Sequence, residues 1–326
     1  MRIGVAGHGV VGRRVVAQLA ERPEVEEVLL LGSPGPVHPA TPKARAVDER
    51  VLRTESSVVV LATPTPQQPL ATVLLGSGCN VVTTSDDSAD VDALVHLERV
   101  ALHGGRSLVV GAAASPGLTG LLARMAADEL DTLDELHVAI HGTGGPACAR
   151  QHHEALGDTS RIWYDGAWQE RPGGTGRELY WFPDPIGAHD CYRAALPDPV
   201  LLHRAFPEAS RITARLTATR RDRLTARLPM LRPPHPEARE GALRVEGRGH
   251  SGTARDAVVL GVARPLGVVA AAVAGAVAVA VASGKLPEGL VVLGDEQLPT
   301  RELVKEVAAD GVAIHRFTGT ASQTSW

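Results

Sequence analysis

The chain has 326 residues, of which 33 are Lys or Arg and 37 are Asp or Glu, so its formal net charge is −4. This balance argues against nucleic-acid binding, because phosphate-contacting proteins usually carry a basic excess or a basic face. With 44% hydrophobic and 21% charged residues, the composition is that of a globular protein rather than a disordered or coiled-coil chain. The length predicts about two domains.

Cysteine and histidine spacing gives no sign of a metal or a disulfide framework. The three cysteines form no CxxC pair, and no spacing among His141, His152, His153 and His189 is typical of metal ligands. The N-terminus lacks an apolar signal segment, which predicts a cytoplasmic protein. Residues 265–283 carry no charge, but their Ala and Gly content favours a buried helix over a membrane span.

A glycine loop lies near the start of the chain. Residues 2–6 are an apolar run that predicts a strand, and residues 13–19 have the apolar spacing of a helix. Between them, residues 7–12 read GHGVVG, a GxGxxG loop. In a strand, loop and helix unit the first glycine makes the turn, the second admits a pyrophosphate, and the third lets helix pack on strand. We therefore expect a dinucleotide here; the alternative is a purely structural glycine turn.

The second predicted strand bears on the choice of nucleotide. Residues 27–31 run into Gly32 and Ser33, where NAD-preferring proteins usually carry an acidic residue for the ribose 2′-hydroxyl. No carboxylate stands there to repel a 2′-phosphate, and Lys43 and Arg45 follow in a proline-rich loop. The pattern favours NADP, with NAD as the alternative cofactor. The alternative interpretation of Lys43 and Arg45 is that they are solvated charges of the loop without a role in cofactor binding.

Further strands at residues 57–62, 80–84 and 107–111 alternate with helical stretches. This alternation predicts a Rossmann fold, an α/β doubly wound parallel sheet. Because ligands of such sheets bind at the carboxyl ends of the strands, the residues that follow these strands join the expected site. The expected cofactor-binding residues are Gly7, His8, Gly9, Val10, Val11, Gly12, Ser33, Thr63, Pro64 and Thr84.

The second half of the chain changes character. Strands are predicted at residues 136–141, 210–217, 241–246 and 257–262, and the Ala-rich residues 266–282 read as a buried helix that ends near a glycine. We expect a Rossmann domain at residues 1–130, a second, smaller domain at 131–264 that holds the substrate and dimerises, and a segment at 265–326 that packs back on the first domain.

Aromatic residues are concentrated in one window. Seven of the ten lie between residues 163 and 192, together with several polar groups capable of chemistry. We expect a substrate pocket in this window; the alternative is that the aromatics only build the core of the second domain. The arginine-rich and proline-rich residues 220–239 are predicted to form a solvated loop, with a mobile flap over an anionic substrate as the alternative.

Four motifs, taken in order, resemble those of the saccharopine dehydrogenase-like reductases. They are GHGVVG at residues 7–12, GAAASPGLT at 111–119, Gly144-Gly145, and WFPDPIG at 181–187. The resemblance implies a Rossmann domain, an α+β domain whose mixed sheet covers the cofactor cleft, and a last helix that returns to the first domain. It also implies a pyridine nucleotide and reduction of an imine between an amine and a keto acid.

The chain departs from the saccharopine-specific members of that family. They typically carry an acidic residue before the Pro-Gly pair, where this chain has Ser115, and they are longer. Saccharopine itself is therefore not the expected substrate. By their place in these motifs, Ser115, Gly144 and Gly145 are candidates for substrate binding.

Three side chains are candidate proton donors for a carbonyl or imine that accepts a hydride. His152 and His153 titrate near neutral pH, and Tyr192 offers a hydroxyl. Because adjacent residues point to different sides of a helix or strand, at most one of the two histidines is expected to face the pocket. Arg150 is a candidate clamp for a substrate carboxylate; the alternative is a salt-bridge role.

These observations favour an NADP-preferring oxidoreductase that acts on a small polar imine or carbonyl compound. We expect neither nucleic acid nor a membrane as a partner, and the sequence is compatible with a homodimer. One alternative is a sugar-type Rossmann dehydrogenase, but its usual lysine after the fifth strand is replaced by Thr84-Ser85-Asp86. Another is a non-catalytic dinucleotide-binding sensor or scaffold.

Overall fold

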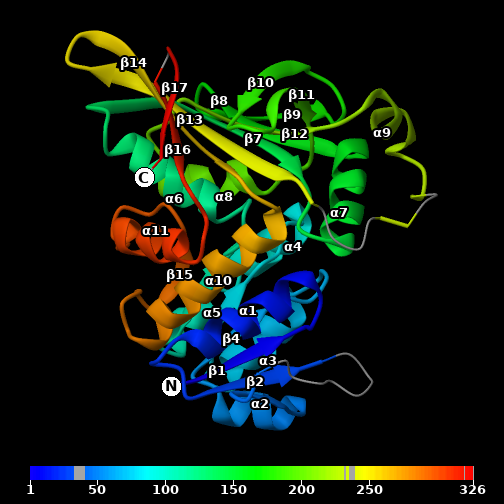
Figure 1. The fold of residues 1–326 in the computed structure, drawn as a ribbon, viewed down its shortest axis with the longest axis vertical. Coiled ribbons are helices and arrows are strands. Elements are labelled where there is room, and N and C mark those ends of the chain that lie inside the picture. Colours follow the sequence, from blue (N-terminus) through cyan, green and yellow to red (C-terminus); the bar gives the residue numbers. More distant parts are fainter. Residues whose placement is uncertain (33–40, 231–232, 235–238, 319, 326) are drawn as a thin grey trace.

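The computed structural model describes residues 1–32, 41–230, 233–234, 239–318 and 320–325. The lower part of the molecule in Figure 1 is built on a parallel sheet with the order β15-β6-β5-β4-β1-β2-β3. Its strands are β1 (Arg2–Ala6), β2 (Glu27–Leu31), β3 (Ala44–Ala46), β4 (Val58–Leu61), β5 (Asn80–Thr83), β6 (Ser107–Val110) and β15 (Gly289–Val292). The predicted doubly wound Rossmann sheet is thereby confirmed.

Helices cover both faces of this sheet. One face carries α1 (Val10–Glu21), α6 (Leu118–Ala127), α10 (Leu266–Ala282) and α11 (Thr300–Ala309); the other carries α2 (Glu49–Glu55), α3 (Gln68–Gly76), α4 (Ser88–Val95) and α5 (Glu98–His103). Strand side chains alternate between two cores: Val5 lies in the core of α1 and α10, and Ala6 in that of α3 and α4. Because both faces are buried, the strands read as continuous apolar runs.

A second, mixed sheet lies above the first, in the upper part of Figure 1, with the order β10-β11-β12-β7-β13-β14-β16-β17 and the strands β8 and β9 attached to β12. Its strands are β7 (Thr132–Gly142), β8 (Thr159–Tyr164), β9 (Ala167–Pro172), β10 (Glu178–Phe182), β11 (Gly187–Arg193), β12 (Arg211–Thr217), β13 (Gly241–Ser251), β14 (Ala254–Ala263), β16 (His315–Thr318) and β17 (Thr320–Ser325). β12 pairs parallel with β7, and the other ladders of this sheet are antiparallel.

The two sheets share one hydrophobic core. Leu136 and Val138 of β7 belong to the same buried cluster as Leu121 of α6 and Val273 of α10. Three more helices join this half: α7 (Pro146–Gly157), α8 (Asp198–Ala205) and α9 (Arg220–Thr225). In Figure 1, α7 extends from the second sheet down toward the first, so its start lies at the junction of the two halves.

The C-terminal segment divides between the two sheets. Helix α10 packs against α1 and α11, with nearly all its residues buried, and β15 pairs with β6 of the first sheet. The last strands differ from the expectation that residues 265–326 all pack on the first domain, because β16 pairs with β14 of the second sheet. Among the described residues, no helix is long and apolar enough to cross a membrane.

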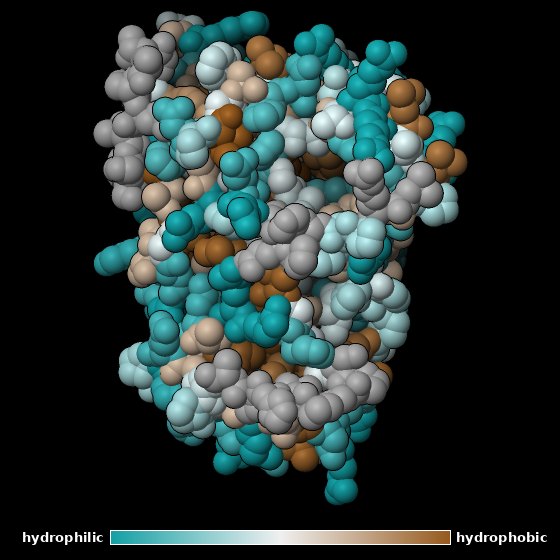
Figure 2. Space-filling model, turned by 45° about the vertical axis from the view of Figure 1, so that its right-hand side comes forward, coloured by the Kyte–Doolittle hydropathy of each residue, from teal (hydrophilic) through white to brown (hydrophobic). Residues whose placement is uncertain are grey.

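The exposed surface is mainly polar on the face that Figure 2 shows, with apolar residues in small separate patches. The aromatic-rich window contributes to the surface: Trp181 is 62% and Trp168 42% exposed. Both lie on the hairpins β8–β9 and β10–β11 of the second sheet.

Candidate active site

A cavity of about 790 Å³ lies between the first sheet and α7. Its wall is formed by the loop after β1, the segments after β4, β5 and β6, and the first turns of α7 and α10. The sequence-predicted residues on it are Gly7, His8, Gly9, Val10, Val11, Thr63, Pro64, Thr84, Ser115, Gly144, Gly145, Arg150 and His152. The cavity is thus at the carboxyl edge of the parallel strands, where ligands of this sheet type bind.

The glycine loop has the packing that a dinucleotide site needs. A Cβ at Gly7, whose φ is +103°, would lie 2.5 Å from the Ala62 carbonyl oxygen, and a Cβ at Gly12 would lie 2.0 Å from the Gly7 carbonyl oxygen. A Cβ at Gly9 would meet no atom within 4 Å. The first and third glycines therefore bring helix and strand together, and the second leaves open space in front of the N-terminus of α1.

A hydrogen-bonded set holds the segments after β4 and β5. The Gln67 side chain donates to the Thr63 carbonyl oxygen at 2.8 Å and accepts from the Thr84 backbone N–H at 3.1 Å. The Thr84 hydroxyl donates to the Leu61 carbonyl oxygen at 2.9 Å, and Asp90 accepts from the Gln67 backbone N–H. Thr63 and Thr84 therefore line a wall whose shape is fixed by these bonds.

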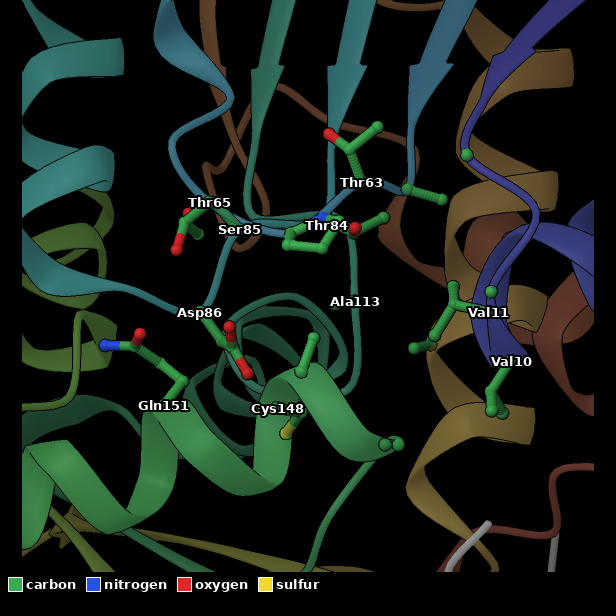
Figure 3. A pocket seen from close by; sticks show the side chains of 18 of the residues that line it. Val10, Val11, Thr63, Thr65, Thr84, Ser85, Asp86, Ala113, Cys148 and Gln151 are labelled. Carbon is green, nitrogen blue, oxygen red and sulfur yellow. The ribbon is translucent and has the colours of Figure 1, made fainter. Parts of the chain in front are cut away.

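Three polar side chains meet at the α7 side of the cavity: Asp86, Cys148 and His152. Asp86 follows β5, whereas Cys148 and His152 lie one turn apart on α7. The Cys148 Sγ lies 3.6 Å from the His152 Nε2, and one donor atom from each of the three residues lies within 4.8 Å of the others. Figure 3 shows the Asp86 carboxylate directed at α7 beside Cys148.

Burial determines the protonation of this cluster. Burial first, and the neighbouring Asp86 carboxylate second, raise the pKa of the Cys148 thiol well above its usual value, so the thiol keeps its proton and hydrogen-bonds Asp86. Burial lowers the pKa of His152, against the opposing effects of Asp86 and of a hydrogen bond to the Gly142 backbone. His152, only 6% exposed, is therefore a neutral imidazole at neutral pH.

Arg150 and Gln151 lie on the same helix as the cluster. Arg150 is exposed, lines the cavity, and has no carboxylate partner among the described residues, so its guanidinium is available to an anionic group in the cavity. The Gln151 amide donates to the carboxylate of Asp87, the residue that caps α4 by accepting from the Asp90 backbone N–H. That bond ties α7 to the loop after β5.

Ser115 lines the cavity but its hydroxyl is engaged in the fold. The Ser115 Oγ and the Thr119 Oγ1 each donate to the Asp198 carboxylate at 2.7 Å. Burial raises the pKa of Asp198 above its usual value, although both hydrogen bonds act in the opposite direction. The Ser-Pro-Gly motif thus connects the loop after β6 to α8 of the second half.

Two of the three predicted proton donors lie outside the cavity, and these predictions are corrected. His153 faces the other side of α7, where its Nε2 lies 2.9 Å from the Leu228 carbonyl oxygen. Tyr192 is buried in the core beneath Arg223, whose guanidinium lies 4.1 Å from the ring centre. Both fail for the same reason: each belongs to a face of its element that packs against α9 and its following loop.

The expected aromatic substrate pocket is also absent, since none of the described residues that line the cavity is Phe, Tyr or Trp. The window at residues 163–192 instead forms two hairpins of the second sheet. There Trp163 stacks on His203 at 3.9 Å between ring centres and donates its Nε1–H to the Ala209 carbonyl oxygen. The WFPDPIG motif likewise lies at the turn between β10 and β11, away from the cavity.

The two cations expected to favour NADP are engaged in the fold. The Lys43 ammonium donates to the carbonyl oxygens of Arg22 and Val25 at 2.9 and 3.0 Å. Arg45 pairs with Glu27 and with Glu55. Neither is free to neutralise a 2′-phosphate, and Ser33, the other residue of that prediction, lies outside the described residues.

Sequence reasoning misses Cys148, and it gives Asp86 no role, although Asp86 follows a strand that ends at the expected site. The N-cap of α4 is Asp87, and Asp86 lines the cavity instead. Cys148 read as one of three unrelated cysteines. The available signal is the spacing of Cys148 and His152, because two residues four apart share one face wherever the chain is helical.

Comparison with known proteins supports the fold. No family model and no curated protein sequence matches the chain. Among solved structures, apo saccharopine dehydrogenase (L-Glu forming) from Saccharomyces cerevisiae superposes with a TM-score of 0.71 at 14% identity, covering 100% of this chain and 99% of that one. The DAP dehydrogenase of C. glutamicum gives a TM-score of 0.58 at 15% identity, covering 95% of this chain and 98% of its own.

A third structure, an engineered D-amino acid dehydrogenase bound to NADP+, gives a TM-score of 0.57 at 14% identity and covers 95% of this chain and 98% of that one. At such identities the likeness concerns the fold. The two-part architecture that the resemblance to saccharopine dehydrogenase-like reductases implied is therefore confirmed over the full length of the chain.

Proposed function

We propose that the protein is an NAD(P)-dependent oxidoreductase that transfers hydride between the nicotinamide and a small polar carbonyl or imine compound. The observation that carries this proposal is one shared cavity. The glycine loop, the ends of β4 and β5, and the cluster of Asp86, Cys148 and His152 all line it.

The cavity fits a dinucleotide. The open space at Gly9 faces the N-terminus of α1, whose unpaired N–H groups and positive dipole end favour a pyrophosphate. In a doubly wound sheet the adenosine lies over the half that contains β2, and the nicotinamide over the half that contains β4 to β6. Thr63 and Thr84 follow β4 and β5, so they are proposed neighbours of the nicotinamide and its ribose.

The residues of the cluster are then proposed to act at the acceptor. The cofactor, when bound, supplies the hydride, and the protein must stabilise the acceptor's oxygen or nitrogen as it gains electrons. His152 is neutral and Cys148 is a protonated thiol hydrogen-bonded to Asp86. The thiol, with Asp86 behind it, is therefore the proposed local source of a proton, and the His152 Nε2 lies 3.6 Å from its sulfur.

Arg150 suggests the class of substrate. Its exposed guanidinium at the cavity can bind a carboxylate through two parallel hydrogen bonds. The structurally similar proteins include dehydrogenases named for saccharopine, DAP and D-amino acids. An amino-acid-like substrate, reduced from an imine or oxidised from an amine, is consistent with both observations.

We also propose a preference for NADPH over NADH, which one residue of the chain still supports. With Lys43 and Arg45 engaged elsewhere, it rests on the absence of an acidic side chain at Gly32, the residue that follows β2 and lines the cavity. The ratio of kcat/KM values for NADPH and NADH measures it, and a ratio below one would reject the preference.

The test of the oxidoreductase function is steady-state oxidation of NADPH and NADH with a panel of α-keto acids, each with and without an amine. We expect turnover with a carboxylated member, and a kcat lowered about 10²-fold or more in Cys148→Ser with unchanged cofactor affinity, as for loss of a general acid. Tyr192→Phe, outside the cavity, is the matched control. Dinucleotide binding without turnover by any member would favour the sensor or scaffold alternative.

A further inference from the structure

The cluster at the α7 side of the cavity contains three different kinds of metal-binding atom. A carboxylate, a thiol and an imidazole converge from two separate elements, the loop after β5 and the helix α7. Cys148 and His152 lie one helical turn apart, so both side chains project from the same face. Both of them, and Asp86, also line the cavity.

The spacing of these atoms matches a tetrahedral zinc site. With Zn–S of about 2.3 Å and Zn–N of about 2.0 Å, a tetrahedral angle separates sulfur and nitrogen by about 3.5 Å. The Cys148 Sγ and the His152 Nε2 are 3.6 Å apart. The Asp86 carboxylate completes a set whose donor atoms all lie within 4.8 Å of one another.

His152 is held as metal-binding histidines are. Its ring hydrogen-bonds the backbone of Gly142. Where one nitrogen of a neutral imidazole donates to a carbonyl oxygen, the other nitrogen keeps a lone pair that can bind a metal. Ligating histidines usually donate their second N–H to a carbonyl or carboxylate in this way, which fixes the tautomer and the ring orientation.

We infer that Asp86, Cys148 and His152 bind one divalent metal ion of the zinc type. A thiolate ligand selects zinc and similar soft or borderline ions over magnesium and calcium, which prefer oxygen donors. Binding deprotonates the thiol, so that a sulfur–metal bond replaces the S–H bond and one proton leaves to solvent. Three protein ligands leave a fourth position that faces the cavity, as in catalytic zinc sites.

This site goes beyond the proposed oxidoreductase function and does not depend on it, because the ion needs only the three side chains. In an active enzyme the ion would polarise the oxygen or nitrogen of the acceptor as a Lewis acid, in the place where the metal-free protein offers the Cys148 proton. The site departs from the expectation of no metal, which considered cysteine spacing and histidine spacing separately.

The experiment uses the full chain after treatment with a chelator, titrated with Co²⁺ as a spectroscopic probe and then with Zn²⁺ as competitor. We expect the visible bands of tetrahedral cobalt, a near-ultraviolet thiolate-to-cobalt charge-transfer band, and displacement by one equivalent of Zn²⁺. Calorimetry in two buffers of different ionisation enthalpy should give release of about one proton per ion.

Variants assign the ligands. Cys148→Ser should abolish the charge-transfer band, and Asp86→Asn should weaken Zn²⁺ binding at least about tenfold, since even outer-shell changes typically cost 10–100-fold. Cys191→Ser is the matched control, because Cys191 is buried in the second sheet away from the cavity, and it should keep the band. Circular dichroism of each variant verifies folding.

The inference is overturned if the wild type gives no charge-transfer band, or if the band survives in folded Cys148→Ser. NADPH binding, measured on the metal-free protein, reports separately on the proposed function. Binding of NADPH without binding of Co²⁺ would support the oxidoreductase proposal and reject the metal site. Binding of Co²⁺ without binding of NADPH would support the metal site and reject the oxidoreductase proposal.

Discussion

Substitution by alanine at two glycines of the loop after β1 should affect stability differently. In Gly12→Ala the new Cβ would lie 2.0 Å from the Gly7 carbonyl oxygen, and real Cβ contacts essentially never fall below 3.0 Å. Helix α1 must therefore move by at least 1.0 Å, because the obstacle is backbone. Overpacking of this kind costs typically about 1–3 kcal/mol.

Gly9→Ala should leave the fold unharmed and damage only binding. Its φ of −68° and ψ of −163° suit any residue, and the added Cβ meets no atom within 4 Å. The free energy of unfolding should stay equal or rise by about 0.4–1 kcal/mol, because the unfolded chain loses freedom. The methyl group would occupy the space proposed for the pyrophosphate, so NADPH affinity should fall at least about tenfold, or roughly 1.4 kcal/mol.

Urea unfolding and NADPH titration by nicotinamide fluorescence measure the two effects separately. We expect lost stability and lost affinity for Gly12→Ala, and lost affinity alone for Gly9→Ala. If Gly9→Ala bound NADPH as tightly as the wild type, the pyrophosphate would not lie at this loop and the placement of the cofactor would be refuted.

Three further predictions concern residues in and around the cavity. Asp198→Ala leaves the hydroxyls of Ser115 and Thr119 without their acceptor and should cost about 1–3 kcal/mol in urea unfolding; no loss would show that the connection to α8 is dispensable. Because burial lowers the pKa of His152 below 6.5, its proton binds the unfolded chain preferentially and stability should fall as pH drops below about 6.5. His152→Asn should flatten that fall, and an unchanged pH profile would contradict it. Tyr192→Phe should leave kcat and KM unchanged, whereas a large loss of kcat would restore the tyrosine as a proton donor.

Much of the fold could be predicted because its signals are local. The GxGxxG loop and the continuous apolar strands specify a strand, turn and helix within a few residues of one another. The buried helix α10 spans the predicted residues 266–282, because its uncharged composition fits only an interior helix. The helical stretch expected between β5 and β6 forms two helices, α4 and α5, which are separated at His96, whose ring bonds the Asp92 carbonyl.

The candidate site was less predictable because it depends on which faces meet across the two halves. Asp86 and Cys148 are 62 residues apart in the sequence. They meet only because α7 packs against the carboxyl edge of the first sheet. His152 and His153 have equal sequence signals, yet one faces the cavity and the other α9. Lys43 read as a phosphate ligand, but its partners are backbone carbonyls that no sequence pattern reveals.

The most direct test of the central claim is a thermal-shift titration of the wild-type chain with NADPH and with NADH. A ligand that binds only the native state at about 100 times its Kd adds roughly 2.7 kcal/mol of stability, enough to raise Tm by several degrees. We expect a saturable shift with at least one of the two nucleotides, larger for NADPH. No shift with either at millimolar concentration would contradict it.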